Sequence, residues 1–268
     1  THPETRLRKQ YVNKTTMPKF FLITGAGTGI GQAIALTLAD QGFSLILCGR
    51  NLESLEETKT QLKNPENHST HSCDIRKIGD VQSCLNKTNT ESLYGLVANA
   101  GIGGENTFGE KDRWREIIET NLTGTYQTVQ ECLPYLKNDA ASYKKVVILS
   151  SILARLGVPG YSAYCASKAG LLGLTRSLAA EHSGDKILIN ALCPGWVDTK
   201  MAREGIEGFA EALNITKEQA FQEAMKPVPL GKMSEPEEIA LFVDYLLSEK
   251  QTSLTGQTID INNGALMP

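Results

Sequence analysis

Short apolar runs alternate with longer amphipathic stretches from residue 19 onward, and this alternation constrains the fold more than any other feature. Several runs are continuously apolar, as in Val146-Val147-Ile148-Leu149, which is typical of strands covered on both faces. We expect seven strands, at Phe20–Thr24, Ser44–Cys48, Ser69–Cys73, Tyr94–Ala98, Lys145–Ser150, Ile187–Leu192 and Thr258–Ile261. Strands that alternate with helices form parallel sheets with helices on both faces, so we predict an α/β protein with a doubly wound, seven-stranded parallel sheet.

The amphipathic stretches give the expected helices. They lie near residues 30–41, 52–63, 76–88, 111–137, 162–182 and 235–248. Residues 200–230 break the alternation with apolar residues at helical spacing, which predicts a small helical lid; simple packing of these residues on the core is the alternative. No linker divides the chain, so residues 18–268 are expected to form one domain after a flexible arm at residues 1–17.

Composition excludes several classes of function. The formal net charge is -3 and no Lys/Arg cluster is present, so a nucleic-acid partner is not expected. No apolar run approaches the roughly 20 residues that span a bilayer, and no secretory signal is evident, which predicts a cytoplasmic protein without a membrane partner. His68, His71 and Cys73 lack a second ligand pair, so no metal site is expected, and the six cysteines are predicted to be free thiols.

A glycine-rich turn follows the first predicted strand and begins the first predicted helix. It reads Thr24-Gly25-Ala26-Gly27-Thr28-Gly29-Ile30-Gly31. Glycines allow a tight turn, and free N–H groups at a helix N-terminus favour a bound pyrophosphate. A tight turn without ligand is the alternative, but the strand–turn–helix context predicts a dinucleotide site at Gly25, Thr28, Gly29, Ile30 and Gly31.

The end of the second strand bears on which cofactor is used. NAD sites place an acid there, whereas this chain reads Cys48-Gly49-Arg50-Asn51. The guanidinium of Arg50 can bind a 2′-phosphate, with Thr28 as a further hydroxyl contact, so NADP(H) is favoured over NAD(H). A solvated Arg50 at a helix start is the alternative, and NAD(H) stays open.

Tyr164 and Lys168 are four residues apart in a predicted helix and therefore share one face. A nearby ammonium favours the phenolate, so Lys168 is expected to lower the pKa of Tyr164 from its usual value near 10. Ser151 lies at the end of the fifth predicted strand, at the sheet edge where parallel sheets place their chemistry. Its hydroxyl can hold a substrate oxygen while Tyr164 exchanges a proton.

Together these motifs resemble the short-chain dehydrogenase/reductase family over about residues 18–266. The chain has the family's TGxxxGxG turn, Asp74 before a helix, Asn99-Ala100-Gly101, Asn121, Ser151, Tyr164, Lys168 and Pro194-Gly195, in the family's order. The resemblance implies a Rossmann-type fold and hydride transfer between a nicotinamide and a carbonyl or secondary alcohol. Thr28 stands where many NADP users have Lys or Arg. The motif Ala98-Asn99-Ala100-Gly101 has one asparagine where many relatives have two in succession.

The resemblance also implies roles for single residues. Tyr164 would be the general acid or base, Ser151 would orient the substrate oxygen, and Lys168 would bind ribose hydroxyls and lower the pKa of Tyr164. Asn121 would kink its helix and hold a water that relays protons to Lys168; packing of buried backbone is its alternative role. The remaining cofactor contacts would come from Asp74, Ile75, Asn99, Gly101, Pro194, Gly195, Val197 and Thr199.

The substrate is less constrained. Apolar residues in the loop 152–161 and the lid suggest an apolar pocket, with Arg155 expected to be solvated. The stretch Leu213–Met225 and the C-terminal Thr255–Thr258 resemble 3-oxoacyl-carrier-protein reductases and polyketide ketoreductases, which implies a 3-oxoacyl thioester substrate on an acyl carrier protein or CoA. Lys144, Lys145 and Lys186 are candidate contacts for an acidic carrier.

Other functions stay open. They are an NAD(H)-dependent alcohol or hydroxysteroid-type dehydrogenase, a non-catalytic NADP-binding regulator, and a sugar-nucleotide epimerase. A regulator would be expected to lack one of Ser151, Tyr164 and Lys168, and all three are present. Family resemblance alone implies a homotetramer.

Overall fold

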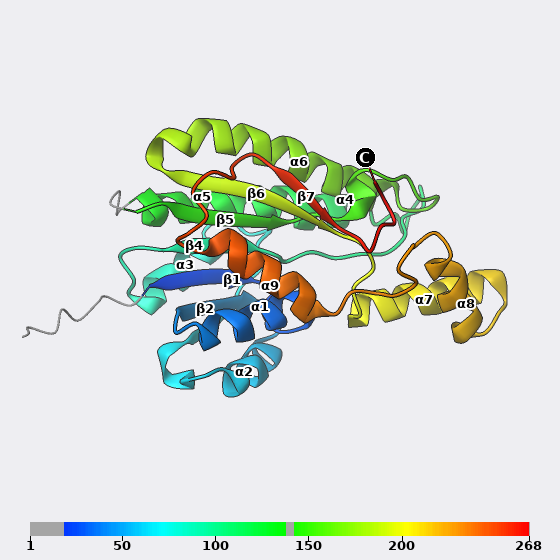
Figure 1. Ribbon diagram of the computed structural model, residues 1–268, viewed down its shortest axis with the longest axis horizontal. Helices are drawn as coiled ribbons and strands as arrows, with labels where there is room; N and C mark the ends of the chain where they lie inside the picture. Colours follow the sequence, from blue (N-terminus) through cyan, green and yellow to red (C-terminus); the bar gives the residue numbers. More distant parts are fainter. Residues whose placement is uncertain (1–18, 138–141, 268) are drawn as a thin grey trace, which may run out of the picture.

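The computed structural model describes residues 19–137 and 142–267, and its centre is a parallel seven-stranded sheet of order β3-β2-β1-β4-β5-β6-β7 (Figure 1). The strands are β1 (Phe20–Thr24), β2 (Ser44–Gly49), β3 (Ser69–Ser72), β4 (Gly95–Ala98), β5 (Lys144–Leu149), β6 (Ile187–Pro194) and β7 (Thr258–Ile261). The predicted fold class is confirmed, and each strand lies where the apolar pattern placed it. The expected arm at residues 1–17 lies outside the described residues.

The strand order creates a switch point between β1 and β4. The chain builds outward from β1 through β2 to β3, then crosses to β4 and continues to β7. The first residue of β4, Gly95, leaves no room for a side chain. A Cβ there would lie 2.5 Å from the Phe21 ring and 2.8 Å from the Lys145 carbonyl oxygen. Ligands of open α/β sheets bind at such switch points, beyond the carboxyl ends of the strands.

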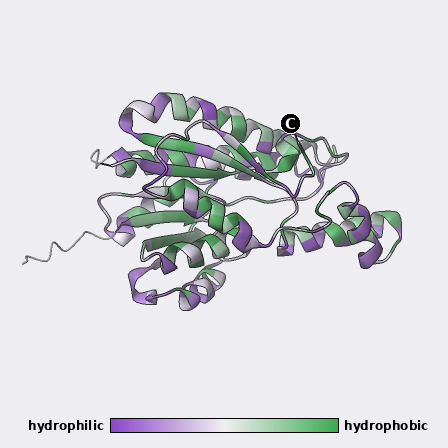
Figure 2. Ribbon diagram, viewed as in Figure 1, coloured by the Kyte–Doolittle hydropathy of each residue, from purple (hydrophilic) through white to green (hydrophobic). Residues whose placement is uncertain are grey.

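Helices cover both faces of the sheet. Apolar side chains of α1 (Gly29–Asp40), α2 (Leu52–Gln61) and α9 (Pro236–Leu247) pack in one core layer. Those of α3 (Asp80–Thr88), α5 (Gly124–Lys137) and α6 (Ser162–His182) pack in the other. Figure 2 shows hydrophobic strands between helices whose outer faces are hydrophilic. No helix in the described ranges is long and apolar enough to cross a membrane.

The helix predicted over residues 111–137 is interrupted. It consists of α4 (Trp114–Ile118), a π-helical turn (Glu119–Thr123) and α5. A π-turn inserts an extra residue into the helix and is frequent at functional sites. It contains the buried Asn121, so the predicted distortion of the helix at this residue is present.

The segment 200–230 contains two helices, α7 (Lys200–Leu213) and α8 (Lys217–Met225), which we call the lid. They pack on each other through Ile206, Ala210 and Ala220 and project beyond the carboxyl edge of the sheet (Figure 1). A capping box between Thr216 and Gln219 starts α8. Part of the apolar spacing in this segment therefore reflects packing within the lid, whereas Met201, Phe209, Leu213 and Phe221 are exposed.

Several side chains named as ligand candidates are used inside the fold. All six cysteines are free, and only Cys165 is not fully buried. His68 Nδ1 accepts a hydrogen bond from Leu45 N at 3.1 Å. The expected role of Lys144 and Lys145 as exposed carrier contacts is wrong, because both are buried at the start of β5, at the opposite end of the strands from the carboxyl edge. Lys145 Nζ donates to the Gln251 carbonyl there.

Candidate active site

The glycine-rich turn is held together by the protein itself. Gly25 has a φ of +67° and donates its N–H to the Cys48 carbonyl at 2.7 Å. A Cβ on Gly31 would lie 2.1 Å from the Gly25 oxygen, so that position requires glycine. Asn99 Nδ2 donates to the carbonyl oxygens of Thr24 and Gly25, both at 3.1 Å. The turn is therefore preformed, and Asn99 acts on it as a structural brace.

The first turn of α1 can bind an anion. In the described part of the chain the N–H groups of Gly29, Ile30 and Gly31 make no hydrogen bond, and this first turn contains no acidic residue. The exposed Thr28 is the N-cap but its side chain makes no capping bond. Thr199, from beyond β6, lies against this turn, since a Cβ on Gly29 would be 3.1 Å from its methyl group. Unpaired donors and the positive helix end fit a pyrophosphate.

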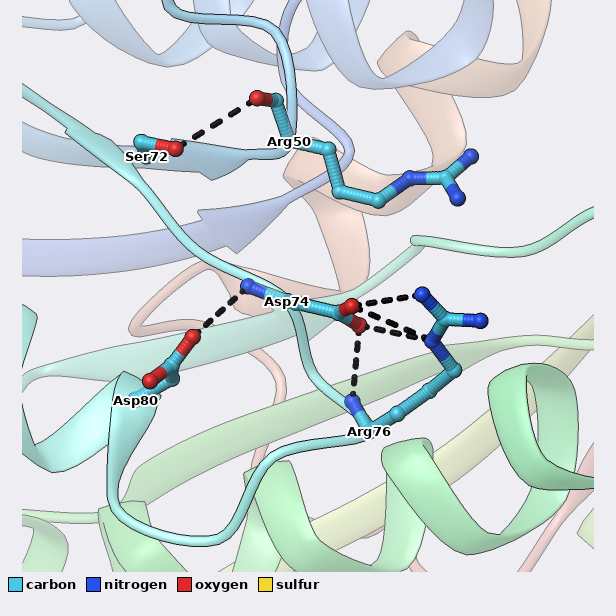
Figure 3. A network of polar contacts seen from close by, with 5 residues as sticks. All are labelled: Arg50, Ser72, Asp74, Arg76 and Asp80. Carbon is cyan, nitrogen blue, oxygen red and sulfur yellow. Dashed lines mark hydrogen bonds and ion pairs between the residues drawn. The ribbon is translucent and has the colours of Figure 1, made fainter.

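The carboxyl ends of β2 and β3 bring Arg50 and Asp74 together (Figure 3). The Arg50 side chain is exposed, and within residues 19–137 and 142–267 its guanidinium donates no hydrogen bond. The Asp74 carboxylate is bound by Arg76, whose Nη2 lies 2.6 Å from Oδ2. Ile75 is buried, and a Cβ on Gly124 would be 2.8 Å from its side chain. A free guanidinium at this edge fits a 2′-phosphate.

Asn121 and Gly101 connect the cofactor side to the catalytic residues. Asn121 Oδ1 accepts from Ile102 N at 2.8 Å, and its Nδ2 donates to the Ile102 oxygen at 2.9 Å and to Ser167 Oγ at 3.1 Å. A Cβ on Gly101 would be 3.2 Å from Asn121 Oδ1 and 3.4 Å from Lys168 Nζ. The Asn121 amide is thus bonded to protein groups, so its alternative role, bonding of buried backbone, is observed. Its role in a water relay stays a prediction.

Ser151, Tyr164 and Lys168 come together at the carboxyl edge. Ser151 lies two residues beyond the end of β5, and its Oγ accepts from Leu153 N at 3.2 Å. The Tyr164 side chain on α6 lies close enough for the Ser151 hydroxyl to lower its pKa. Lys168 lies one helical turn further, with Nζ 5.7 Å from the centre of the Tyr164 ring and 2.9 Å from the Leu149 oxygen. A hydroxyl, a phenol and an ammonium therefore share one buried corner.

The titration of this corner differs from the sequence expectation. Burial raises the pKa of Tyr164 above its usual value, and the Ser151 hydrogen bond offsets only part of that rise. Burial also lowers the pKa of Lys168 to about 8. The net pKa of Tyr164 is therefore raised and not lowered in the chain alone, because desolvation disfavours both charged forms. The neutral phenol is a proton donor in this state.

The residues after β6 complete the edge. Pro194 ends β6, and Gly195 donates to the Ile261 oxygen at 2.8 Å. Val197 is buried and pairs with Ser234 in an isolated parallel bridge. Thr199 caps α7 by accepting from Ala202 N at 3.3 Å. These residues set the start of the lid beside the glycine-rich turn.

Two arginines have partners that the sequence pattern did not reveal. Arg155, expected to be solvated, bonds Asp260 on β7 at 3.1 Å. The sequence motifs assign no role to Arg76, although it binds Asp74 in the cofactor region. A cation two residues after an acid at a strand end is the only signal that could have pointed to Arg76, and such pairs are common on surfaces.

Comparison with known proteins shows which family has this arrangement. A family model described as enoyl-(acyl carrier protein) reductase matches residues 25–265. The 3-oxoacyl-[acyl-carrier-protein] reductase FabG of Rickettsia prowazekii is 34% identical over 251 residues, which cover 93% of this chain and 97% of that protein.

Solved structures of related reductases have the same fold. A variant of the actinorhodin polyketide ketoreductase, solved with NADPH, aligns with a TM-score of 0.85 and 30% identity over 92% of this chain and 97% of the other. The 3-ketoacyl-(acyl-carrier-protein) reductase of Brucella melitensis, complexed with NADH, aligns with a TM-score of 0.80 and 24% identity over 92% of this chain and 98% of the other. The chain therefore belongs to the short-chain dehydrogenase/reductase family and is an NAD(P)-dependent oxidoreductase.

Proposed function

We propose that the protein is an NADPH-dependent ketoreductase whose substrate is a 3-oxoacyl thioester. The observation that carries the reaction type is the corner formed by Ser151, Tyr164 and Lys168, with a hydroxyl, a neutral phenol and an ammonium beside a preformed anion-binding turn. The substrate class is supported by the ketoacyl reductases among the relatives.

The residues divide the work of carbonyl reduction. A bound nicotinamide would supply the hydride. Ser151 Oγ would donate a hydrogen bond to the substrate oxygen, and the nearby Tyr164 would transfer its phenolic proton to that oxygen. The ammonium of Lys168 would stabilise the resulting phenolate, because an adjacent positive charge favours the ionised form.

The cofactor choice rests on Arg50. Replacing Arg50 with alanine is expected to raise the KM for NADPH about 10- to 100-fold, because a hydrogen bond to a charged group contributes about 1.5–3 kcal/mol. The KM for NADH should change less than about twofold, since that dinucleotide has no 2′-phosphate. Initial rates with each dinucleotide measure both constants.

A matched variant controls for the loss of charge. Arg176 is exposed on α6 and has no place in the proposed site, so Arg176→Ala should leave both constants unchanged. Equal KM values for NADPH and NADH in the unaltered protein would contradict the NADPH assignment. The NAD(H)-dependent dehydrogenase would then replace it.

The substrate class is tested by following NADPH consumption with acetoacetyl thioesters of CoA and of acyl carrier protein, beside simple cyclic ketones. We expect a higher kcat/KM for the thioesters, because the exposed Leu156 and Val158 give the catalytic edge an apolar border that fits an acyl chain. Turnover of cyclic ketones alone would refute the thioester assignment. Absence of any turnover, with dinucleotide bound, would favour the non-catalytic regulator.

We propose that copies of the chain assemble through α9, in line with the expected homotetramer. Leu241 is 65% exposed and Tyr245 is 50% exposed, one helical turn apart on the same face of α9. The mass of the protein in solution, measured by light scattering, tests this proposal. A monomer would contradict it.

A further inference from the structure

The second cation at the cofactor edge, Arg76, is fixed by the Asp74 carboxylate through several bonds. Arg76 Nε lies 2.9 Å from Oδ1 and 3.2 Å from Oδ2, and Arg76 Nη2 lies 2.6 Å from Oδ2. The Arg76 backbone N–H also donates to Oδ1 at 3.1 Å. A planar guanidinium that engages both oxygens is held more firmly than a single point contact would hold it.

The strand register places this pair beside Arg50. Gly49 of β2 pairs with Ser72 of β3, so Arg50, one residue beyond β2, and Asp74, two residues beyond β3, follow neighbouring parallel strands. The Arg76 hydrogen bond is the main cause of the low pKa of Asp74, and the positive charge of Arg50 adds a smaller lowering effect. In Figure 3 the guanidinium groups of Arg50 and Arg76 extend to the same side, and the Asp74 carboxylate points toward the Arg76 guanidinium.

The Asp74 carboxylate would oppose a phosphate at this edge if it were unpaired. Its side chain is only 18% exposed, so solvent screens its charge poorly, and like charges at short range repel. Asp74 is negatively charged at neutral pH, and the Arg76 hydrogen bond lowers its pKa further, to about 2. The carboxylate is therefore neutralised by its partner, and not by a proton.

We propose that Arg76 is a specificity-determining residue of the cofactor site, which cancels the charge of Asp74 and so allows a 2′-phosphate to bind at Arg50. This inference rests on the proposed use of NADPH. Arg76 acts through Asp74, and its Nη1, which makes no hydrogen bond among the described residues, needs no contact with the phosphate for this effect. A dinucleotide without the 2′-phosphate gains little from the neutralisation.

The test compares two half-ligands that differ by one group, adenosine 2′,5′-bisphosphate and 5′-AMP, by titration calorimetry. Arg76→Ala is expected to weaken binding of the bisphosphate about tenfold or more, because an uncompensated carboxylate then faces the added phosphate. Binding of 5′-AMP should change less than about threefold. Lys77→Ala is the matched control, since Lys77 is the exposed cation next in the chain, and it should leave both affinities unchanged.

A rescue variant isolates the mechanism. Asn at position 74 keeps an acceptor oxygen but has no charge, so Asp74→Asn combined with Arg76→Ala should restore most of the affinity for the bisphosphate. Arg76→Lys keeps the charge without the bidentate geometry and should lie between the parent and Arg76→Ala. Thermal unfolding of each variant establishes that it is folded, and Arg76→Lys provides the comparison if Arg76→Ala is not.

The outcomes separate this inference from the cofactor assignment. If the unaltered protein binds the two half-ligands equally well, the NADPH assignment fails and this inference fails with it. If the protein prefers the bisphosphate but Arg76→Ala weakens both ligands equally, the assignment stands and the role of Arg76 is refuted. If the double variant shows no rescue, Arg76 does not act by cancelling the charge of Asp74, and the inference is overturned.

Discussion

Replacing Tyr164 with phenylalanine is expected to lower kcat for carbonyl reduction by about three orders of magnitude. The substitution removes one hydroxyl and keeps the ring. The centre of this ring lies 5.7 Å from Lys168 Nζ. A positioned general acid contributes about 10²- to 10⁴-fold, and Tyr164 is the proton donor that α6 places near Ser151. Dissociation constants for the dinucleotide should stay within about threefold, because the phenolic proton acts on the substrate.

The direction of the pKa shift gives this prediction a pH signature. Burial raises the pKa of Tyr164, so the phenol is protonated at neutral pH and ready to donate in reduction. Oxidation of the alcohol needs the phenolate, so its rate should rise with pH while the rate of reduction does not. In Tyr164→Phe this rise should vanish. Tyr126→Phe removes a hydroxyl from an exposed tyrosine on α5 and is the control; a full kcat in Tyr164→Phe would refute the proposed mechanism.

The sequence predicted the sheet well because buried parallel strands have a simple signature. Every residue of β5 and β6 is buried, and each of those strands is rich in apolar residues. The glycine-rich turn was predictable from its spacing alone. One glycine, Gly31, meets the nearby Gly25 oxygen, whereas the others meet residues far along the chain, such as Thr199 against Gly29.

Most features that escaped prediction depend on distant partners, and the pair of Arg76 and Asp74 is the local exception. Arg155 pairs with Asp260, and Lys145 donates to the Gln251 carbonyl; each partner lies about a hundred residues further along the chain. The spacing of Tyr164 and Lys168 predicted their shared face correctly. It could not reveal that burial would act on both groups more strongly than they act on each other. Desolvation is set by the whole fold, so it is not readable from a motif.

Replacing Lys168 with methionine is expected to lower kcat about a hundredfold or more while making the free protein more stable at neutral pH. The ammonium is 5% exposed and bonded to the Leu149 oxygen, and burial lowers its pKa to about 8 from 10.5. Holding this charge in the fold therefore costs about 3 kcal/mol at pH values where it is protonated. Methionine fills a similar volume without a charge, at the loss of one hydrogen bond.

The sign of the pH dependence makes this prediction sharp. Between about pH 8 and about pH 10 the unfolded chain holds a proton on Lys168 that the folded chain has released, so raising the pH stabilises the folded parent protein. Below pH 8 both states are protonated and the cost is constant. Denaturant unfolding at several pH values should therefore show Lys168→Met as the more stable protein at pH 7, with its advantage falling by up to about 3 kcal/mol toward pH 10. A stability difference that does not change with pH would mean that Lys168 is not buried as a strained cation, and its place in the proton chemistry of Tyr164 would have to be reconsidered.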